Sequence, residues 1–84
     1  MDEFKINFLF DHSHYTAHVA THKAADHIQY TVSPEDKALK KKFATQVIHR
    51  FGDALEFAFP GQGPEAEQYN RSLETALRHT LKLK

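Results

Sequence analysis

The fold of this chain is decided by residues 4–32, which read FKINFLFDHSHYTAHVATHKAADHIQYTV. Apolar and polar side chains alternate in three segments of this stretch, at residues 4–10, 14–22 and 27–33. Alternation with a period of two is typical of strands that bury one face. The short segments that separate them interrupt the pattern and predict turns. The stretch therefore predicts an antiparallel meander of three strands.

The predicted register follows from the same alternation. A turn at residues 12–13 places Phe8 opposite Ala17, and the second turn places Val19 opposite Tyr30. Both pairings put the apolar side chains on one face of the sheet. A slip of one residue in either hairpin would move the apolar set of one strand to the other face. The sequence therefore specifies which face of the meander is buried.

A helix is predicted over residues 34–51. Ser33 is a capping residue, Pro34 occupies the first helical position, and Gly52 favours the helix end. Apolar residues recur at helical spacing across the segment: Leu39, Phe43, Val47, Ile48 and Phe51. On this interpretation one long helix follows the meander.

A second interpretation of the same segment stays open. The helix ends near Lys42, and residues 44–51 and 54–59 form a hairpin that turns at residues 52–53. Three residues in the second half of the segment are poor helix formers, which favours this interpretation: Thr45, Val47 and Ile48.

One strand and one helix complete the predicted fold. Residues 54–59 form a strand on either interpretation, with Leu55 and Phe57 on the same side. A helix follows over residues 64–82, with the apolar stripe Tyr69, Leu73, Ala76, Leu77 and Leu81. We expect a single α+β domain over residues 1–84. Its predicted order is β-β-β-α-β-α, with both helices packed on the aromatic face of the sheet.

Composition excludes several classes of protein. The chain has 84 residues and no cysteine, which excludes disulfides, thiolate zinc sites and cysteine nucleophiles. Eleven basic residues balance eleven acidic residues, so no global field attracts nucleic acid or anionic membranes. No apolar run approaches the ~18 residues of a membrane span. Residues 1–5 lack the basic-then-apolar order of a signal peptide. We expect a cytoplasmic protein without a cofactor.

No motif in the sequence carries a reaction. Asp11, Ser13 and His14 cluster at the first predicted turn. A nucleophilic serine also requires an oxyanion hole and a substrate pocket, and the tip of a hairpin supplies neither. Turn chemistry explains these residue types equally well. We therefore predict a non-enzymatic protein with no catalytic residues.

The polar face of the predicted sheet is the candidate interaction surface. It carries four of the seven histidines, whose ordinary pKa near 6.5 leaves the face weakly charged at neutral pH. The candidate protein-interaction residues are His14, Thr16, His18, His22, His27, Gln29 and Thr31. One edge strand of the sheet is expected to be free for pairing with another chain. These features predict a protein-interaction or accessory domain, whose partner is another protein or a second copy in a homodimer.

A metal site is one alternative. His22 and His27 are predicted to face each other across the second hairpin, with Asp26 as a third ligand. His14, His18 and His22 recur every fourth residue. On a strand, however, such residues are about 13 Å apart at each step and cannot share one ion.

A nucleic-acid interface is the second alternative. Four lysines give the predicted first helix a basic outer face: Lys37, Lys40, Lys41 and Lys42. Three strands followed by a lysine-bearing helix resemble the β-β-β-α core of double-stranded-RNA-binding domains. The resemblance implies that these lysines bind phosphate. The chain departs from that family because Glu35 and Asp36 hold the start of the helix, and because a leading helix is missing.

Overall fold

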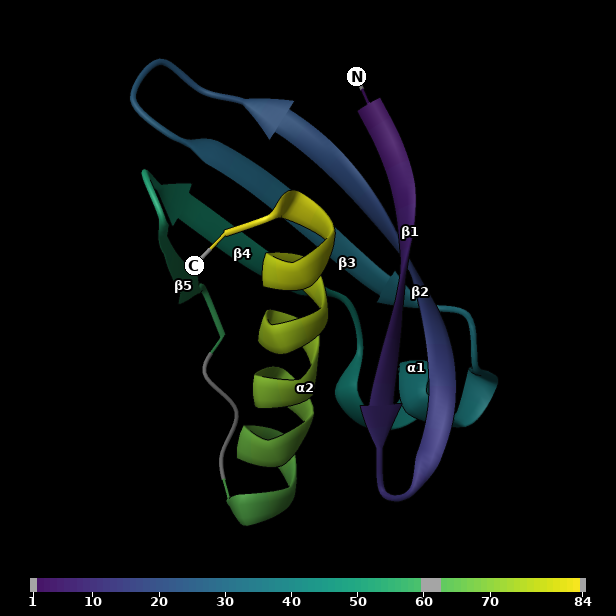
Figure 1. Ribbon diagram of the computed structural model, residues 1–84. Helices are drawn as coiled ribbons and strands as arrows, with labels where there is room; N and C mark the ends of the chain where they lie inside the picture. Colours follow the sequence, from purple (N-terminus) through teal and green to yellow (C-terminus); the bar gives the residue numbers. More distant parts are fainter. Residues whose placement is uncertain (1, 60–62, 84) are drawn as a thin grey trace.

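Alternation of apolar and polar side chains produces the predicted meander and extends it to five strands. The computed structural model describes residues 2–59 and 63–83. Their elements are β1 (Asp2–Phe10), β2 (Ser13–Lys23), β3 (Ile28–Pro34), α1 (Lys37–Phe43), β4 (Gln46–Phe51), β5 (Ala54–Phe57) and α2 (Pro64–Leu81). The sheet order is β1-β2-β3-β4-β5, and every neighbouring pair is antiparallel. The α+β class is confirmed. α2 lies across one face of the sheet, which we call the inner face (Figure 1).

The first hairpin pairs two residues away from the predicted register. Phe8 lies opposite Tyr15 instead of Ala17. The turn is formed by Asp11 and His12, whose φ angles are 50° and 64°. Tight two-residue hairpin turns of this kind require positive φ at both central residues, which aspartate tolerates better than most residues. The predicted turn at residues 12–13 is therefore wrong by one position.

The second hairpin is shifted in the same way. Val19 lies opposite Val32 instead of Tyr30, because the turn closes through a hydrogen bond from the Ala24 N–H to the His27 carbonyl, at 2.9 Å. A shift of two residues leaves each side chain on its predicted face. Val19 and Tyr30 are accordingly both buried, as predicted.

The prediction of one helix over residues 34–51 is wrong, and the alternative hairpin is confirmed. α1 begins after Asp36, whose carboxylate accepts a hydrogen bond from the Leu39 N–H at 3.0 Å. It ends at Ala44, which has a φ of 59°. The chain then forms β4 and β5, turning at Gly52 with a φ of 63°. β-Branched residues suit the pleated strand better than a helix, and their pairing with β3 stabilises β4.

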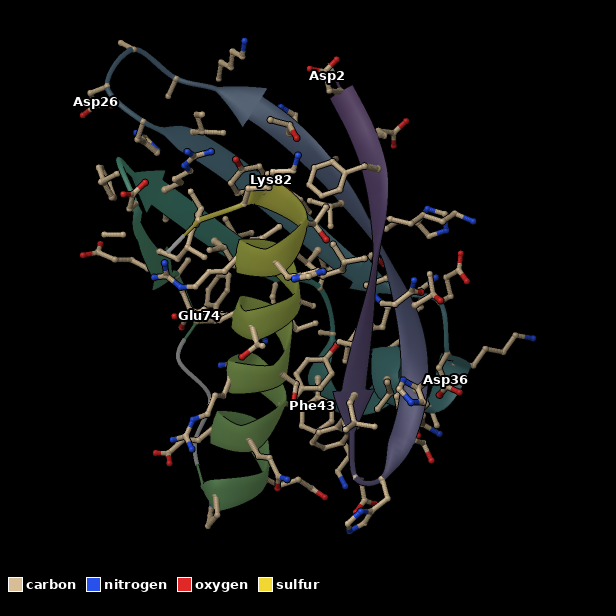
Figure 2. The ribbon with its side chains drawn as sticks, viewed as in Figure 1. Asp2, Asp26, Asp36, Phe43, Glu74 and Lys82 are labelled. Carbon is tan, nitrogen blue, oxygen red and sulfur yellow. The ribbon has the colours of Figure 1, made fainter. Side chains whose placement is uncertain are left out.

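The hydrophobic core lies between α2 and the inner face. Its buried apolar residues are Ile6, Phe8, Phe10, Ala17, Val19, Tyr30, Val32, Leu39, Ile48, Tyr69, Leu73, Ala76 and Leu77. The Tyr69 ring stacks on Phe43 with centroids 4.1 Å apart, and it meets Phe8 and Phe10 edge-on at 5.7 and 5.4 Å. Figure 2 shows Phe43 in the space between α2 and β1. Such aromatic contacts stabilise a core beyond the area that they bury.

The two helices play different parts in this core. α2 packs on the sheet along its length, whereas α1 lies near one end of β3 and contributes Leu39 and Phe43 (Figure 1). The prediction that both helices cover the aromatic face is therefore correct only for α2. Neither helix in the described residues is long and apolar enough to cross a membrane.

Tyr69 provides a test of this packing. Its hydroxyl is buried and has no hydrogen-bond partner among the described residues, and burial raises the pKa of Tyr69 to about 12. Tyr69→Phe removes an unsatisfied buried oxygen and keeps the ring, so we expect an unchanged or higher free energy of unfolding. Tyr69→Ala should lower it by about 3–5 kcal/mol. Urea denaturation of both variants measures the two effects. A large loss in Tyr69→Phe would show that the hydroxyl has a stabilising partner.

Candidate protein-interaction surfaces

The structure brings the seven predicted interaction residues to the face opposite α2, which we call the outer face. They alternate along β2 and β3 with residues that pack against the core. β2 carries His14, Thr16, His18 and His22, and β3 carries Gln29 and Thr31, with His27 just before it. The sequence therefore predicted correctly which residues share this face.

An uncharged row crosses the middle of the outer face. Ala20 pairs with Thr31, and Thr31 pairs with Val47, so the row spans β2, β3 and β4. Each of these side chains is half-buried. Glu3 of β1 lies opposite Ala20 at one end of the row, and further charged and ionisable groups of the face lie on either side of it.

On one side of this row, Glu35 links the end of β3 to β1 and β2. Its carboxylate lies 3.2 Å from the Lys5 ammonium and 2.7 Å from His18 Nε2. Its N–H donates to the Thr16 carbonyl at 2.9 Å. A hydrogen bond from Lys5 is the main cause that lowers the pKa of Glu35, and the charge of His18 adds to it. His18 is therefore engaged within the chain and is less free to bind a partner than the sequence indicated.

A cluster of rings lies on the other side of the row, at the end of the sheet. His27 lies 5.0 Å, centroid to centroid, from both His49 and Phe51, and it is nearly parallel to Phe51. Its Nδ1 is 2.7 Å from the Asp26 carboxylate, and this hydrogen bond lowers the pKa of Asp26. Asp26 itself lies at the tip of the β2–β3 hairpin (Figure 2).

The preferred sequence interpretation missed His49 and Phe51 because it placed both in a helix. The signal that identifies them is the alternation of Val47, His49 and Phe51, which belongs to the hairpin interpretation. His49 Nδ1 is buried without a hydrogen-bond partner in residues 2–59 and 63–83. The ring cluster is therefore packed closely, although Phe51 remains 43% exposed.

The pairing on which the metal hypothesis depended is wrong. His22 lies opposite Gln29, and His27 lies opposite Ala24 at the turn. The shifted register of the second hairpin separates the two histidines. Within the part of the chain that the structure describes, no group of three His, Cys, Asp or Glu side chains is placed to hold a metal ion.

The four lysines of the nucleic-acid hypothesis lie on α1. Lys37, Lys40 and Lys41 are exposed, and Lys42 forms an ion pair with Glu65 of α2 at 2.6 Å. α1 has seven residues, and its start is capped by Asp36. RNA binding by this short helix stays a prediction, with three lysines available for it.

The outer edge of β1 is the longest free edge of the described sheet. In β2, the Thr16 carbonyl accepts from the Glu35 N–H, and the Ala24 N–H donates to the His27 carbonyl. Even-numbered residues of β2 therefore direct their main-chain groups toward β3. Because such groups alternate in direction along an antiparallel strand, the odd-numbered residues bond to β1.

The register then identifies the unpaired main-chain groups of β1. Odd-numbered Tyr15 of β2 pairs with Phe8, so the even-numbered residues of β1 bond to β2. The N–H and C=O groups that point away from the sheet belong to Glu3, Lys5, Asn7 and Leu9. Among the described strands none pairs with this edge. The opposite edge, β5, has only four residues.

A groove lies beside part of this edge. It has a volume of about 690 Å³, and one wall is formed by β1 and its turn, including Asn7, Leu9 and Asp11. The other wall is the flank of α2, including Arg71 and His79. A volume of roughly 300–1,000 Å³ is usual for sites that bind ligands. The groove is absent from the sequence prediction because it depends on where α2 crosses the sheet.

Glu35 provides a test of the outer face. The ordinary pKa of its carboxyl group is 4.5, and its pKa in the folded chain is lower. Its stabilising effect is therefore fully present above pH 4.5 and is lost as the pH falls through the lowered pKa. We expect Glu35→Gln to be less stable than wild type at pH 7 and equally stable at pH 2 in urea denaturation.

Glu3→Gln is the control for this measurement, because Glu3 is an exposed acid on β1, the strand that carries Lys5, and has no ion pair in the described residues. It should leave the pH dependence of unfolding unchanged. An equal loss in Glu35→Gln at both pH values would mean that Lys5 and His18 do not stabilise the carboxylate.

No protein-family model, no curated protein and no solved structure matches the chain. Its function is therefore argued from the arrangement of its own residues.

Proposed function

We propose that this chain is a non-enzymatic protein-interaction domain that binds its partner through the free edge of β1. The supporting observation is the nine-residue strand whose outward main-chain groups lack a partner in the described sheet. Unpaired strand edges accept an added strand, and main-chain hydrogen bonds supply its affinity. The added strand comes from another protein or from a second copy of the chain.

The edge is better suited to this role than the middle of the outer face. On that face, Lys5 and His18 are held by Glu35, and the Thr16 hydroxyl donates to the Asn7 side chain at 2.9 Å. A partner would have to break these contacts to use the polar groups. The outward N–H groups of β1 require no such exchange.

The polar residues of the β1–β2 hairpin, Asp11, Ser13 and His14, belong to the turn and to the strand that follows it. Asp11 and His12 form the turn, and His14 pairs with Leu9. No hydrogen bond joins the side chains of Asp11, Ser13 and His14 in the described structure. A serine nucleophile needs an adjacent base to activate it.

The edge can be tested by removing one outward N–H group. Asn7→Pro deletes a donor that points away from the sheet, and proline is tolerated at such edge positions. Asn7→Ala is the matched control, because both variants lose the bond from Thr16 and only proline loses the donor. Peptides selected from a displayed random library on wild-type protein should bind Asn7→Pro about tenfold more weakly, with little change for Asn7→Ala. Isothermal titration measures these affinities.

Thr31→Lys separates the edge from the outer face in the same assay. It places a charge in the uncharged row and leaves β1 intact. Selected peptides that bind Asn7→Pro normally and lose affinity for Thr31→Lys would place the interaction on the outer face instead. Failure to select any peptide, with wild-type protein monomeric in sedimentation, would contradict the proposed function altogether.

A further inference from the structure

The groove beside β1 has one wall built from strand and one built from helix. Main-chain groups of Asn7 and Leu9 point toward the free edge, and both residues line the groove. A segment that pairs with this part of β1 therefore lies against the flank of α2. Side chains alternate along an extended segment, so every second one faces that flank.

The residues of α2 that line the groove include one arginine, one histidine and no acid. They are Gln68, Arg71, Ser72, Thr75, Ala76 and His79. Arg71 is exposed and makes no ion pair or side-chain hydrogen bond in residues 2–59 and 63–83. The neighbouring cation on the same helix differs, because Arg78 is held by Glu74 at 2.9 Å. An acidic side chain from a partner would supply Arg71 with an ion-pair partner.

The opposite wall of the groove consists of residues of β1 and of the β1–β2 turn. Asp11 is its one acid, and it lies in the hairpin turn beside His12. Leu9 is 54% exposed and lies on the outer side of β1. A bound segment therefore meets an apolar side chain on the outer side of the strand, and Arg71 and His79 on the side of α2.

From this arrangement we propose that the groove binds an extended acidic peptide, which pairs with β1 as an added strand and directs acidic side chains to Arg71 and His79. This rests on the proposed function, and it names the chemistry of the partner. A second copy of the chain is a poorer occupant, because it brings a second Arg71 toward the first one. Like charges facing each other disfavour that pairing.

Two blocked eight-residue peptides test the proposal. In the first, glutamate alternates with valine, and in the second, glutamine replaces each glutamate. Titration of labelled wild-type protein at low salt should shift the amide signals of Asn7 and Leu9 and the side-chain signal of Arg71. The glutamate peptide should bind roughly fivefold more tightly than the glutamine peptide, as expected for an exposed ion pair.

Substitutions in α2 connect this preference to Arg71. Arg71→Gln should abolish the difference between the peptides, and Arg71→Glu should reverse it in favour of a peptide with lysine in place of glutamate. Lys41→Gln is the matched control, because it removes one exposed positive charge from α1, outside the groove. It should leave the preference for glutamate unchanged.

Each contrary outcome identifies what has failed. Equal binding of both peptides at the β1 edge would overturn the acidic preference and leave the proposed edge interaction standing. A dimer in sedimentation that Asn7→Pro converts to monomer would make a second copy the occupant, which overturns the peptide proposal alone. Signal shifts confined to α1, lost in Lys41→Gln, would overturn the groove as the site. No shift of any β1 amide with any of the peptides would contradict both proposals.

Discussion

Contact between α2 and the inner face of the sheet is the interaction on which the rest of this structure depends. A sheet that is apolar on one face must bury that face against another element. A chain of this length has little other apolar surface with which to do so. Tyr69, Leu73 and Leu77 recur every four residues on α2 and are completely buried against the sheet. Because α2 takes this position, its flank also forms one wall of the groove, so the buried core and the groove depend on the same helix.

Alternation predicted the buried face of the first three strands correctly and did not fix their pairing. A period of two is unchanged by a shift of two residues, so both registers satisfy the hydrophobic pattern equally. Local backbone geometry makes the choice. Asp11 and His12 adopt positive φ angles, and they place Phe8 opposite Tyr15. No property of the apolar residues could have revealed this.

The segment after the meander was ambiguous for a different reason. Val47, Ile48 and Phe51 satisfy a helical stripe, while Ile48 also continues the alternation of a buried strand. Pairing with β3 decides between them, since Ile48 lies opposite Tyr30 and is completely buried there. This is a tertiary contact, and single-residue propensities only hint at it.

For the candidate site, too, the sequence predicted which residues share a face but not which residues are neighbours across the sheet. Face membership of His18, His22 and Thr31 follows from alternation alone and was predictable. Neighbours across the sheet were not, because they require the register, and His27 consequently meets His49 instead of His22. The groove could not be predicted from the sequence at all. Arg71 lies in it only because α2 crosses the sheet close to β1, and no sequence pattern specifies that crossing.

The order of strands in the sheet has a consequence for how the chain folds. Each strand pairs with its neighbour in sequence, so the sheet can assemble hairpin by hairpin through short loop closures. The contact between β1 and α2 joins the first and the last of these elements in sequence, so it requires the longest loop closure. During synthesis all five strands leave the ribosome before α2 does. The aromatic inner face is then bare for a time, and residues 64–81 determine how long chaperones or other nascent chains have access to it.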